Sequence, residues 1–185
     1  ELVVKQPFPS MPIKFWGDDD GKKYHKAYFT RFENIWHHGD FIEKTSNNGF
    51  IMRGRSDATL NPGGVRIGTS EIYQQVEDID FITEGLVVGQ NYDNDVRIIL
   101  FVTTKKNEEL DDEKIKFIKS KIRKNCSPKH VPSIIIKFPD IPRTKSGKIV
   151  ELAVRKTIHG EKINNKESIA NPDSLDYFRN LKELK

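Results

Sequence analysis

The sequence of 185 residues lacks several features that mark common classes of protein. It contains one cysteine, Cys126, so no disulfide can form within the chain, and we expect a reducing compartment, the cytoplasm. Its longest apolar runs, such as SIIIKF and GLVVG, are far too short to cross a bilayer, which predicts no membrane span. No leader with basic, apolar and small-residue regions opens the chain.

A strong excess of one charge is also absent. The formal net charge is +4, and basic and acidic residues are interspersed along the chain. This balance demands neither nucleic acid nor a membrane surface as a partner, and it suits a small polyanionic ligand equally well. The first residue is Glu1 rather than Met, and it leads directly into the strand-like ELVV. We therefore expect the chain to be a piece of a longer polypeptide.

Residues 1–56 show no helical periodicity of useful length and are predicted to be β-rich. ELVVKQ is typical of a strand, which Pro7 ends because proline cannot donate to a central ladder. Two apolar runs on either side of the Asn-Asn-Gly at 47–49 favour a hairpin. His37 and His38 are neighbours on an expected strand and point to opposite faces, so we predict no metal site there.

Residues 57–159 alternate between helical and strand periodicity. Apolar residues at i, i+4 and i+7 predict a helix at 69–79, and apolar residues on one face with two acids at the start predict another at 111–125. A last helix is expected at 149–158. Strands are predicted at 82–90, 95–104 and 132–138, the first two joined by the turn sequence NYDND. This order predicts an α+β fold with a small mixed sheet and packed helices.

Residues 160–185 are predicted to be a polar C-terminal tail. The segment from Asn171 favours one short helix, with Asn171 as its cap and Pro172 at its first position. No internal repeat or low-complexity tract is present in the sequence.

The loop IPRTKSGKIV, residues 141–150, raises three alternatives. A phosphate-binding P-loop needs a glycine five residues before the Gly-Lys pair and a hydroxyl residue after it, but Pro142 and Ile149 stand at these positions. The second alternative is an ordinary surface loop, because a lone lysine is usually a solvated surface charge. Prolines and a tight turn between a strand and a helix would instead hold Lys148 at a fixed place, as a reactive lysine requires.

Further motifs, taken as an ordered set, favour the third alternative, a reactive lysine at position 148. They are Gly39-Asp40, then Gly54-Arg55-Ser56-Asp57, then Gly64-Val65-Arg66 with Glu71, and finally Pro142 to Lys148. In this order and spacing, over more than a hundred residues, the chain resembles the C-terminal part of the adenylate-forming enzymes, the acyl-CoA synthetases and their relatives. The stretch PIKFWGDDDGKKYHKAYFTRFENIWHHGDF and the tail narrow the resemblance to the branch that activates acetoacetate. Glu151 replaces the commoner arginine-rich pattern after the lysine.

The resemblance implies roles for three residues near the predicted domain boundary. Asp40 would hold the ribose hydroxyls of ATP or AMP, because a carboxylate offers two acceptor oxygens to two hydroxyl donors. Arg55 would be a second nucleotide contact. Asp57 would be the hinge between residues 1–56, the end of a large N-terminal domain, and a mobile C-terminal domain at 57–159. From the local sequence alone, Asp40 and Asp57 are equally well explained as turn residues.

The resemblance also implies the residues of two half-reactions. Gly63 and Gly64 would let the backbone approach the pantetheine arm of CoA, with Arg66 supporting the thioester-forming arrangement. Lys148 would contact ATP and carry adenylate formation, because its ammonium is positively charged at neutral pH and two anions must meet there. From the residues alone, the two glycines could equally form a tight turn.

As a whole, the resemblance implies an ATP-dependent acid–CoA ligase of which this chain is about the last quarter. Its substrates would be ATP, CoA and a short acid such as acetoacetate, with Mg²⁺ bound to ATP by residues outside this chain. The N-terminal domain would be a partner in cis, and the fragment alone would be inactive. A basic module that binds nucleic acid or protein is the alternative, but no stripe of basic and aromatic residues supports it.

Overall fold

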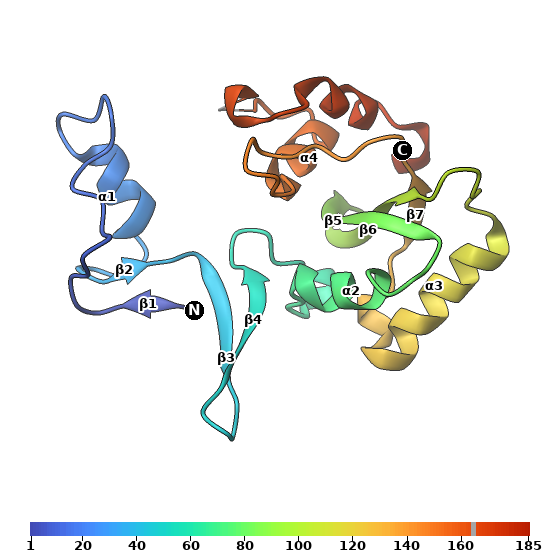
Figure 1. The fold of residues 1–185 in the computed structure, drawn as a ribbon, viewed down its shortest axis with the longest axis horizontal. Helices are drawn as coiled ribbons and strands as arrows, with labels where there is room; N and C mark the ends of the chain where they lie inside the picture. Colours follow the sequence, from blue (N-terminus) through green and yellow to red (C-terminus); the bar gives the residue numbers. More distant parts are fainter. Residues whose placement is uncertain (164–165) are drawn as a thin grey trace. The chain divides into compact units, whose positions relative to one another are not determined.

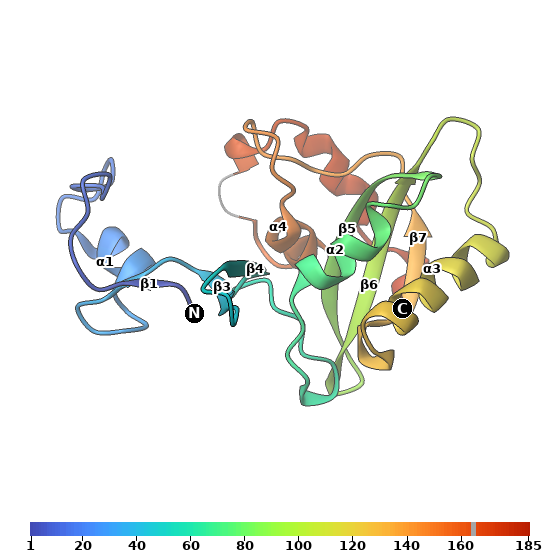
Figure 2. The same cartoon turned by 60° about the horizontal axis from the view of Figure 1, so that its bottom comes forward.

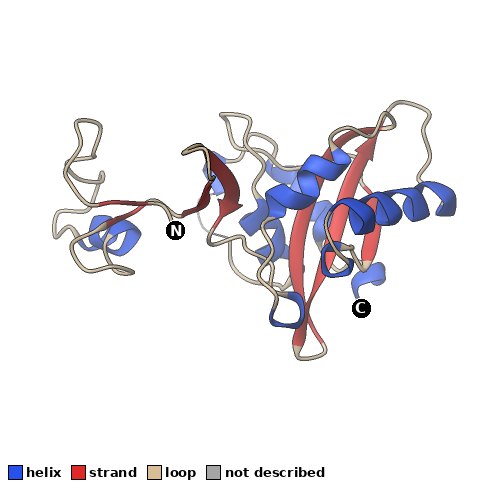
Figure 3. Cartoon of the chain, turned by 90° about the horizontal axis from the view of Figure 1, so that it is seen from below, coloured by secondary structure: helices blue, strands red, loops and turns tan. Residues whose placement is uncertain are grey.

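A computed structural model describes residues 1–163 and 166–185, and the polar-tail prediction at 164–165 lies outside the described residues. The chain divides into two compact units, Glu1–Asp57 and Ala58–Lys185. Figure 3 shows both units coloured by secondary structure. Among the helices of the described residues, none is both long and apolar enough to span a membrane.

The first unit consists of two small antiparallel sheets and one helix. Strand β1 (Val3–Val4) pairs with β2 (Trp36–His37), and β3 (Asp40–Lys44) pairs with β4 (Phe50–Arg55). The hairpin predicted around residues 47–49 is therefore confirmed, with Asn48 at the positive φ of 59° that its turn requires.

Helix α1 (Lys22–Tyr28) was not predicted, because its start depends on a residue outside the helical segment. The buried Asp18 carboxylate accepts hydrogen bonds from Lys23 N and Tyr24 N, at 2.9 and 2.8 Å. These bonds satisfy two of the amide groups that a helix start leaves without partners. Tyr24 and Tyr28 then pack on Trp36, so seven residues suffice for a helix.

The second unit is built on the predicted small mixed sheet, in the order β5-β6-β7. Strands β5 (Ile82–Tyr92) and β6 (Asp95–Thr104) form the antiparallel hairpin, and β7 (Ile134–Lys137) runs parallel to β6. Between β5 and β6, Asp93 and Asn94 take positive φ values of 48° and 58°. The α+β fold class and this hairpin are confirmed.

Helices cover both faces of the sheet because its strands alternate between two apolar cores. One core joins Val87 and Leu100 to α2 (Thr69–Val76) and α3 (Asp112–Asn125). The other joins Leu86 and Phe101 to α4 (Glu151–Ile158) and the C-terminal segment. Figure 1 shows α2 and α3 on one side of the sheet and α4 with the C-terminal segment on the other.

The C-terminal segment differs from the predicted polar tail. Its side chains Ile169, Leu175, Phe178 and Leu184 are buried in the core beneath α4. The expected short helix is a 3₁₀ helix, Pro172–Phe178, which presents Leu175 and Phe178 to that core. Two further 3₁₀ turns, η3 (Lys166–Ser168) and η5 (Lys182–Leu184), belong to the segment, and η5 buries Leu184, a single apolar residue that a largely polar sequence does not reveal as core.

Three further short 3₁₀ or turn elements connect the layers. The helix η1 (Pro62–Gly64) lies inside the loop closed by the bridge between Leu60 and Ile67, and η2 (Pro128–His130) follows α3. The loop before α4 is closed by a bridge between Arg143 and Ile149. The Gly63–Arg66 motif and the Lys148 loop therefore each lie on a short, closed turn, whereas Glu71 lies on α2.

Candidate functional site

In the first unit, Asp40 and Arg55 lie opposite each other on paired strands. Asp40 begins β3 and Arg55 ends β4, and they are direct partners in the ladder. The Arg55 Nη1 atom is 3.9 Å from Asp40 Oδ1. Sequence reasoning singled out both residues but did not predict that they face each other, because the pairing depends on the hairpin register.

Arg55 is bound more tightly to Asp57 than to Asp40. Its Nε and Nη2 atoms donate to the two carboxylate oxygens of Asp57 at 3.1 and 2.8 Å. This bond to Asp57 raises the pKa of Arg55 above its ordinary value. A Cβ at Gly39 would lie 3.1 Å from Arg55 Nη2, and Gly39 has φ of 91°. Glycine therefore lets the guanidinium lie against the backbone beside Asp40.

Beside this pair is a cavity of about 460 Å³, whose lining includes Tyr28, Trp36, His37, Arg55 and Asp57. An aromatic wall with an arginine and a carboxylate at its edge can hold a planar polar ligand. The Asp40 and Asp57 carboxylates already pair with Arg55. No group of three or more His, Cys, Asp or Glu residues suited to a metal ion occurs in the described part of the chain.

In the second unit, Gly63 and Gly64 form a turn with φ values of 57° and 77°. Gly63 N donates to both carboxylate oxygens of Asp95, at 2.8 and 3.0 Å. A Cβ on Gly63 would lie 2.6 Å from Lys129 Nζ. The turn is thus held by the start of β6 and approached by a cation from η2, while Arg66 lies exposed just beyond it.

Sequence reasoning missed Asp95 because its contact with Gly63 joins residues far apart in the chain. The hydrogen bonds from Gly63 N and Val96 N lower the pKa of Asp95. The carboxylate therefore remains charged at neutral pH and holds the Gly63 amide in one direction.

The Lys148 loop is closed by its own backbone and side chains. Thr144 N donates to Lys148 O at 2.8 Å, and Lys148 N donates to Thr144 Oγ1 at 3.0 Å. Gly147, at φ of 82°, makes the tight turn between them. The Arg143 guanidinium donates to Gly147 O and forms an ion pair with Glu84. Lys148 is exposed, so its ammonium is directed by a rigid turn rather than by burial.

The C-terminal segment also holds this loop, which the sequence did not indicate. Lys145 N donates to Ser168 O at 3.0 Å, and Arg143 N donates to Asn171 Oδ1 at 2.9 Å. Ala170 N donates back to Arg143 O at 2.8 Å. The segment at 168–171 therefore forms a second side to the loop.

The two motifs of the second unit lie toward opposite ends of the β5–β6 hairpin. Arg143 pairs with Glu84 near the start of β5, whereas Gly63 binds Asp95 at the turn after Tyr92. Glu84 and Tyr92 are eight residues apart, about 26 Å along a strand. Figure 2 shows the turn before α2 near one end of the hairpin and the segment leading into α4 toward the other. The structure therefore keeps the two predicted sites apart.

Comparison with known proteins gives consistent results at the sequence and structure levels. The chain is 57% identical over 185 residues to an acetoacetyl-coenzyme A synthetase of Rhizobium meliloti, and 46% identical over 186 residues to one of Danio rerio. In both cases 100% of this chain is covered but only 28% of the relative's length. No family model matches the chain.

Among solved structures, acetoacetyl-CoA synthetase from Streptomyces lividans has a TM-score of 0.87 and 42% identity, covering 95% of this chain and 27% of that one. An anthranilate CoA ligase in complex with anthranoyl-AMP has a TM-score of 0.66 at 19% identity, which shows a shared fold alone.

Proposed function

Because the chain belongs to the adenylate-forming acyl-CoA synthetases and matches the C-terminal part of acetoacetyl-CoA synthetases, we propose that it is the C-terminal part of an ATP-dependent acid–CoA ligase. The proposed reaction converts acetoacetate, ATP and CoA to acetoacetyl-CoA, AMP and pyrophosphate through an acyl-adenylate. The remaining three quarters would supply the acid pocket and the ATP phosphate loop in cis. The single cysteine supports the cytoplasm as the location.

Lys148 acts in the first half-reaction. A carboxylate oxygen of the acid bonds to the α-phosphorus of ATP, and the bond from that phosphorus to pyrophosphate breaks. Both reactants are anions, so a fixed ammonium between them stabilises the transition state more than the separated reactants. The closed turn of Thr144, Gly147 and Lys148 supports this role, because a directed cation needs no reorganisation at the moment of reaction.

Asp40 and Arg55 bind the nucleotide in the first unit. The Asp40 carboxylate accepts hydrogen bonds from the ribose hydroxyls, and Arg55 contacts ribose or phosphate oxygens. The cavity beside Arg55, with Tyr28 and Trp36 in its wall, supports a planar ligand at this place. The Asp40 and Asp57 carboxylates are engaged with Arg55 and do not fit a Mg²⁺ site, so we assign no step to the metal.

Gly63, Gly64 and Arg66 act in the second half-reaction. The CoA sulfur, as a thiolate, bonds to the carbonyl carbon of the adenylate, and AMP leaves with the bonding electron pair. The turn supports this role because two adjacent glycines expose its backbone, and Asp95 fixes its direction.

Asp57 is the hinge that lets one unit perform both half-reactions. It is the last residue of the first unit. Because the Lys148 loop and the Gly63 turn lie toward opposite ends of one hairpin, the second unit must turn to present each of them to the same acyl group. This separation of the two motifs is the observation on which the proposal rests.

The test compares Lys148→Ala with Lys145→Ala, an exposed lysine on the same loop, in the enzyme that contains this chain. We expect Lys148→Ala to lower acetoacetate-dependent ATP–pyrophosphate exchange about 10²- to 10³-fold. Thioester formation from preformed acyl-adenylate should be spared, and Lys145→Ala should leave both steps near normal. Equal losses in both steps would contradict the role, as would equal effects of the two variants. The 185-residue chain alone should catalyse neither step.

A further inference from the structure

A partly buried hydrogen bond joins the helix after the Gly63 turn to the helix after the Lys148 loop. Tyr73 on α2 donates from Oη to Glu151 Oε1 at 2.5 Å, and Glu151 is the first residue of α4. The same Tyr73 oxygen accepts a hydrogen bond from Val87 N of β5 at 3.1 Å. One phenol thus ties two helices to β5, an edge strand of the sheet.

The link holds a helix start whose N-cap residue cannot cap it with a side chain. The N-cap residue of α4 is Val150, which makes no side-chain cap bond. A helix start leaves backbone amides without partners and is prone to fray. Glu151 is placed where its negative charge favours the helix dipole, and Tyr73 fixes that carboxylate from the sheet side. The first turn of α4 is therefore attached to the sheet through Tyr73.

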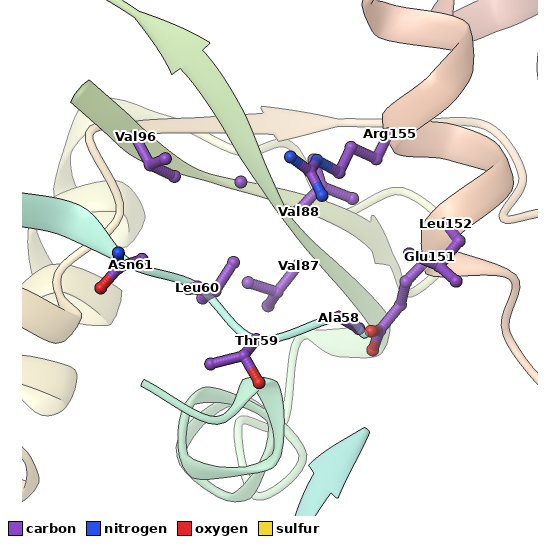
Figure 4. Close-up of a pocket in the computed structure, with 11 residues that line it drawn as sticks. Ala58, Thr59, Leu60, Asn61, Val87, Val88, Val96, Glu151, Leu152 and Arg155 are labelled. Carbon is purple, nitrogen blue, oxygen red and sulfur yellow. The ribbon is translucent and has the colours of Figure 1, made fainter. Parts of the chain in front are cut away.

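Figure 4 shows the cavity that Glu151 lines. Glu151 and Arg155 extend from α4 into a cavity of about 110 Å³, which Val87 and the segment 58–61 also line. That segment follows Asp57 directly. A displaced Glu151 would thus disturb the beginning of α4 at the place where the chain enters the second unit.

The Tyr73 end of the link stays protonated near neutral pH. Burial, followed by the negative charge of Glu151, raises the pKa of Tyr73 well above its ordinary value. The phenol therefore remains a hydrogen-bond donor over the working range of an enzyme.

We propose that Tyr73 and Glu151 are positioning residues for Lys148. Lys148 lies three residues before Glu151, on the loop that leads into α4. Arg143 and the segment at 168–171 fix the entry of the loop. The Tyr73–Glu151 link fixes its exit. This inference rests on the proposed function, because it assigns Lys148 to adenylate formation.

The activity test uses Tyr73→Phe, Glu151→Gln and Glu151→Ala in the enzyme that contains this chain. A misplacement of about 1 Å can cost on the order of 10²-fold in rate. We expect Tyr73→Phe and Glu151→Ala to lower kcat for ATP–pyrophosphate exchange by about 10- to 10²-fold, with the KM for ATP little changed. Thioester formation from preformed adenylate should change less than about threefold. Glu151→Gln should retain most activity, because its amide oxygen still accepts from Tyr73.

Arg155→Ala is the matched control, since Arg155 lines the same cavity one helical turn later. It should leave exchange near the wild-type rate. Equal losses in both half-reactions, normal exchange in Tyr73→Phe, or no rescue by glutamine would each overturn the inference. If the wild-type enzyme shows no exchange, or Lys148→Ala retains it, the proposed function fails instead.

A second measurement does not depend on activity. Amide hydrogen exchange in the 185-residue chain should be faster at 148–153 in Tyr73→Phe and Glu151→Ala than in the wild type or Glu151→Gln. Arg155→Ala should leave these amides unchanged. Protection of 148–153 that is the same in all variants would overturn the link as an anchor, whatever the substrate of the enzyme.

Discussion

Phe178 offers the sharpest test of how the C-terminal segment is held. Its side chain is 0% exposed, and its ring stacks on Phe138 with centroids 4.4 Å apart. It also meets Phe101 edge-on at 4.9 Å. The substitution Phe178→Ala removes this ring from the core under α4 and leaves a cavity between two aromatic side chains.

The magnitude follows from the buried area. An aromatic side chain buries about 150 Å² or more, which at about 25 cal/mol per Å² corresponds to about 4 kcal/mol. Measured Phe→Ala costs in cores are about 3–5 kcal/mol, so we expect a loss of about 4 kcal/mol in the free energy of unfolding. Tyr177 is the matched control, because it is the preceding aromatic residue and is 52% exposed. Tyr177→Ala should cost less than about 1 kcal/mol.

Urea unfolding followed by far-UV circular dichroism measures this difference. With a slope of about 2 kcal/mol per molar urea, Phe178→Ala should lower the midpoint by about 2 M. Both tryptophans, Trp16 and Trp36, belong to the first unit, so their fluorescence reports that unit separately. Equal midpoints for Phe178→Ala and Tyr177→Ala would refute the argument that this segment belongs to the core.

Two further substitutions test the hinge and the glycine turn. Asp57→Pro fixes φ and should block one half-reaction while sparing the other. The control Asp57→Ala removes only the bond to Arg55 and should spare both half-reactions. Normal rates of both half-reactions in Asp57→Pro would exclude the hinge. Asp95→Ala releases Gly63 N and should raise the KM for CoA about tenfold without changing ATP–pyrophosphate exchange, whereas Asp95→Asn should retain part of the effect of the acid. Because the folded-state pKa of Asp95 is lowered, its hold on Gly63 should persist at neutral pH and weaken only as the pH falls through that lowered pKa. A KM for CoA that Asp95→Ala leaves unchanged would contradict this role.

The parts of the fold that the sequence predicted correctly are those with a regular apolar periodicity or a recognisable turn. Helix α3 has its apolar residues on one face and acids at its start, and the β5–β6 hairpin has a turn whose Asp93 and Asn94 tolerate positive φ. Helix α1 could not be predicted, because its start is satisfied by Asp18 from outside the helical segment. The local sequence there reads as a turn.

The candidate sites could likewise be predicted only in part from the sequence. Motif spacing singled out Asp40, Arg55 and Lys148 as candidates, but the contacts that orient them join distant parts of the chain. Asp40 faces Arg55 only through strand register, and the link between Tyr73 and Glu151 spans 78 positions. Single residues of this kind carry no periodicity, so a pattern in one sequence cannot reveal them.

The C-terminal segment is the part of the chain where fold and proposed chemistry depend on each other most directly. Its apolar side chains anchor it under α4, and from that position Asn171 and the backbone at Ser168 bind the Lys148 loop. Asn171 Nδ2 also donates to Asp140 Oδ2 at 2.6 Å and to Ile141 O at 3.1 Å, so one side chain fixes the loop entry from both sides. Loss of the Phe178 side chain should therefore displace Lys148 by weakening the hydrogen bonds between the segment and the loop, and not by changing a charge. On this reasoning, the core residues of the segment would contribute to the proposed adenylate formation without contacting any substrate.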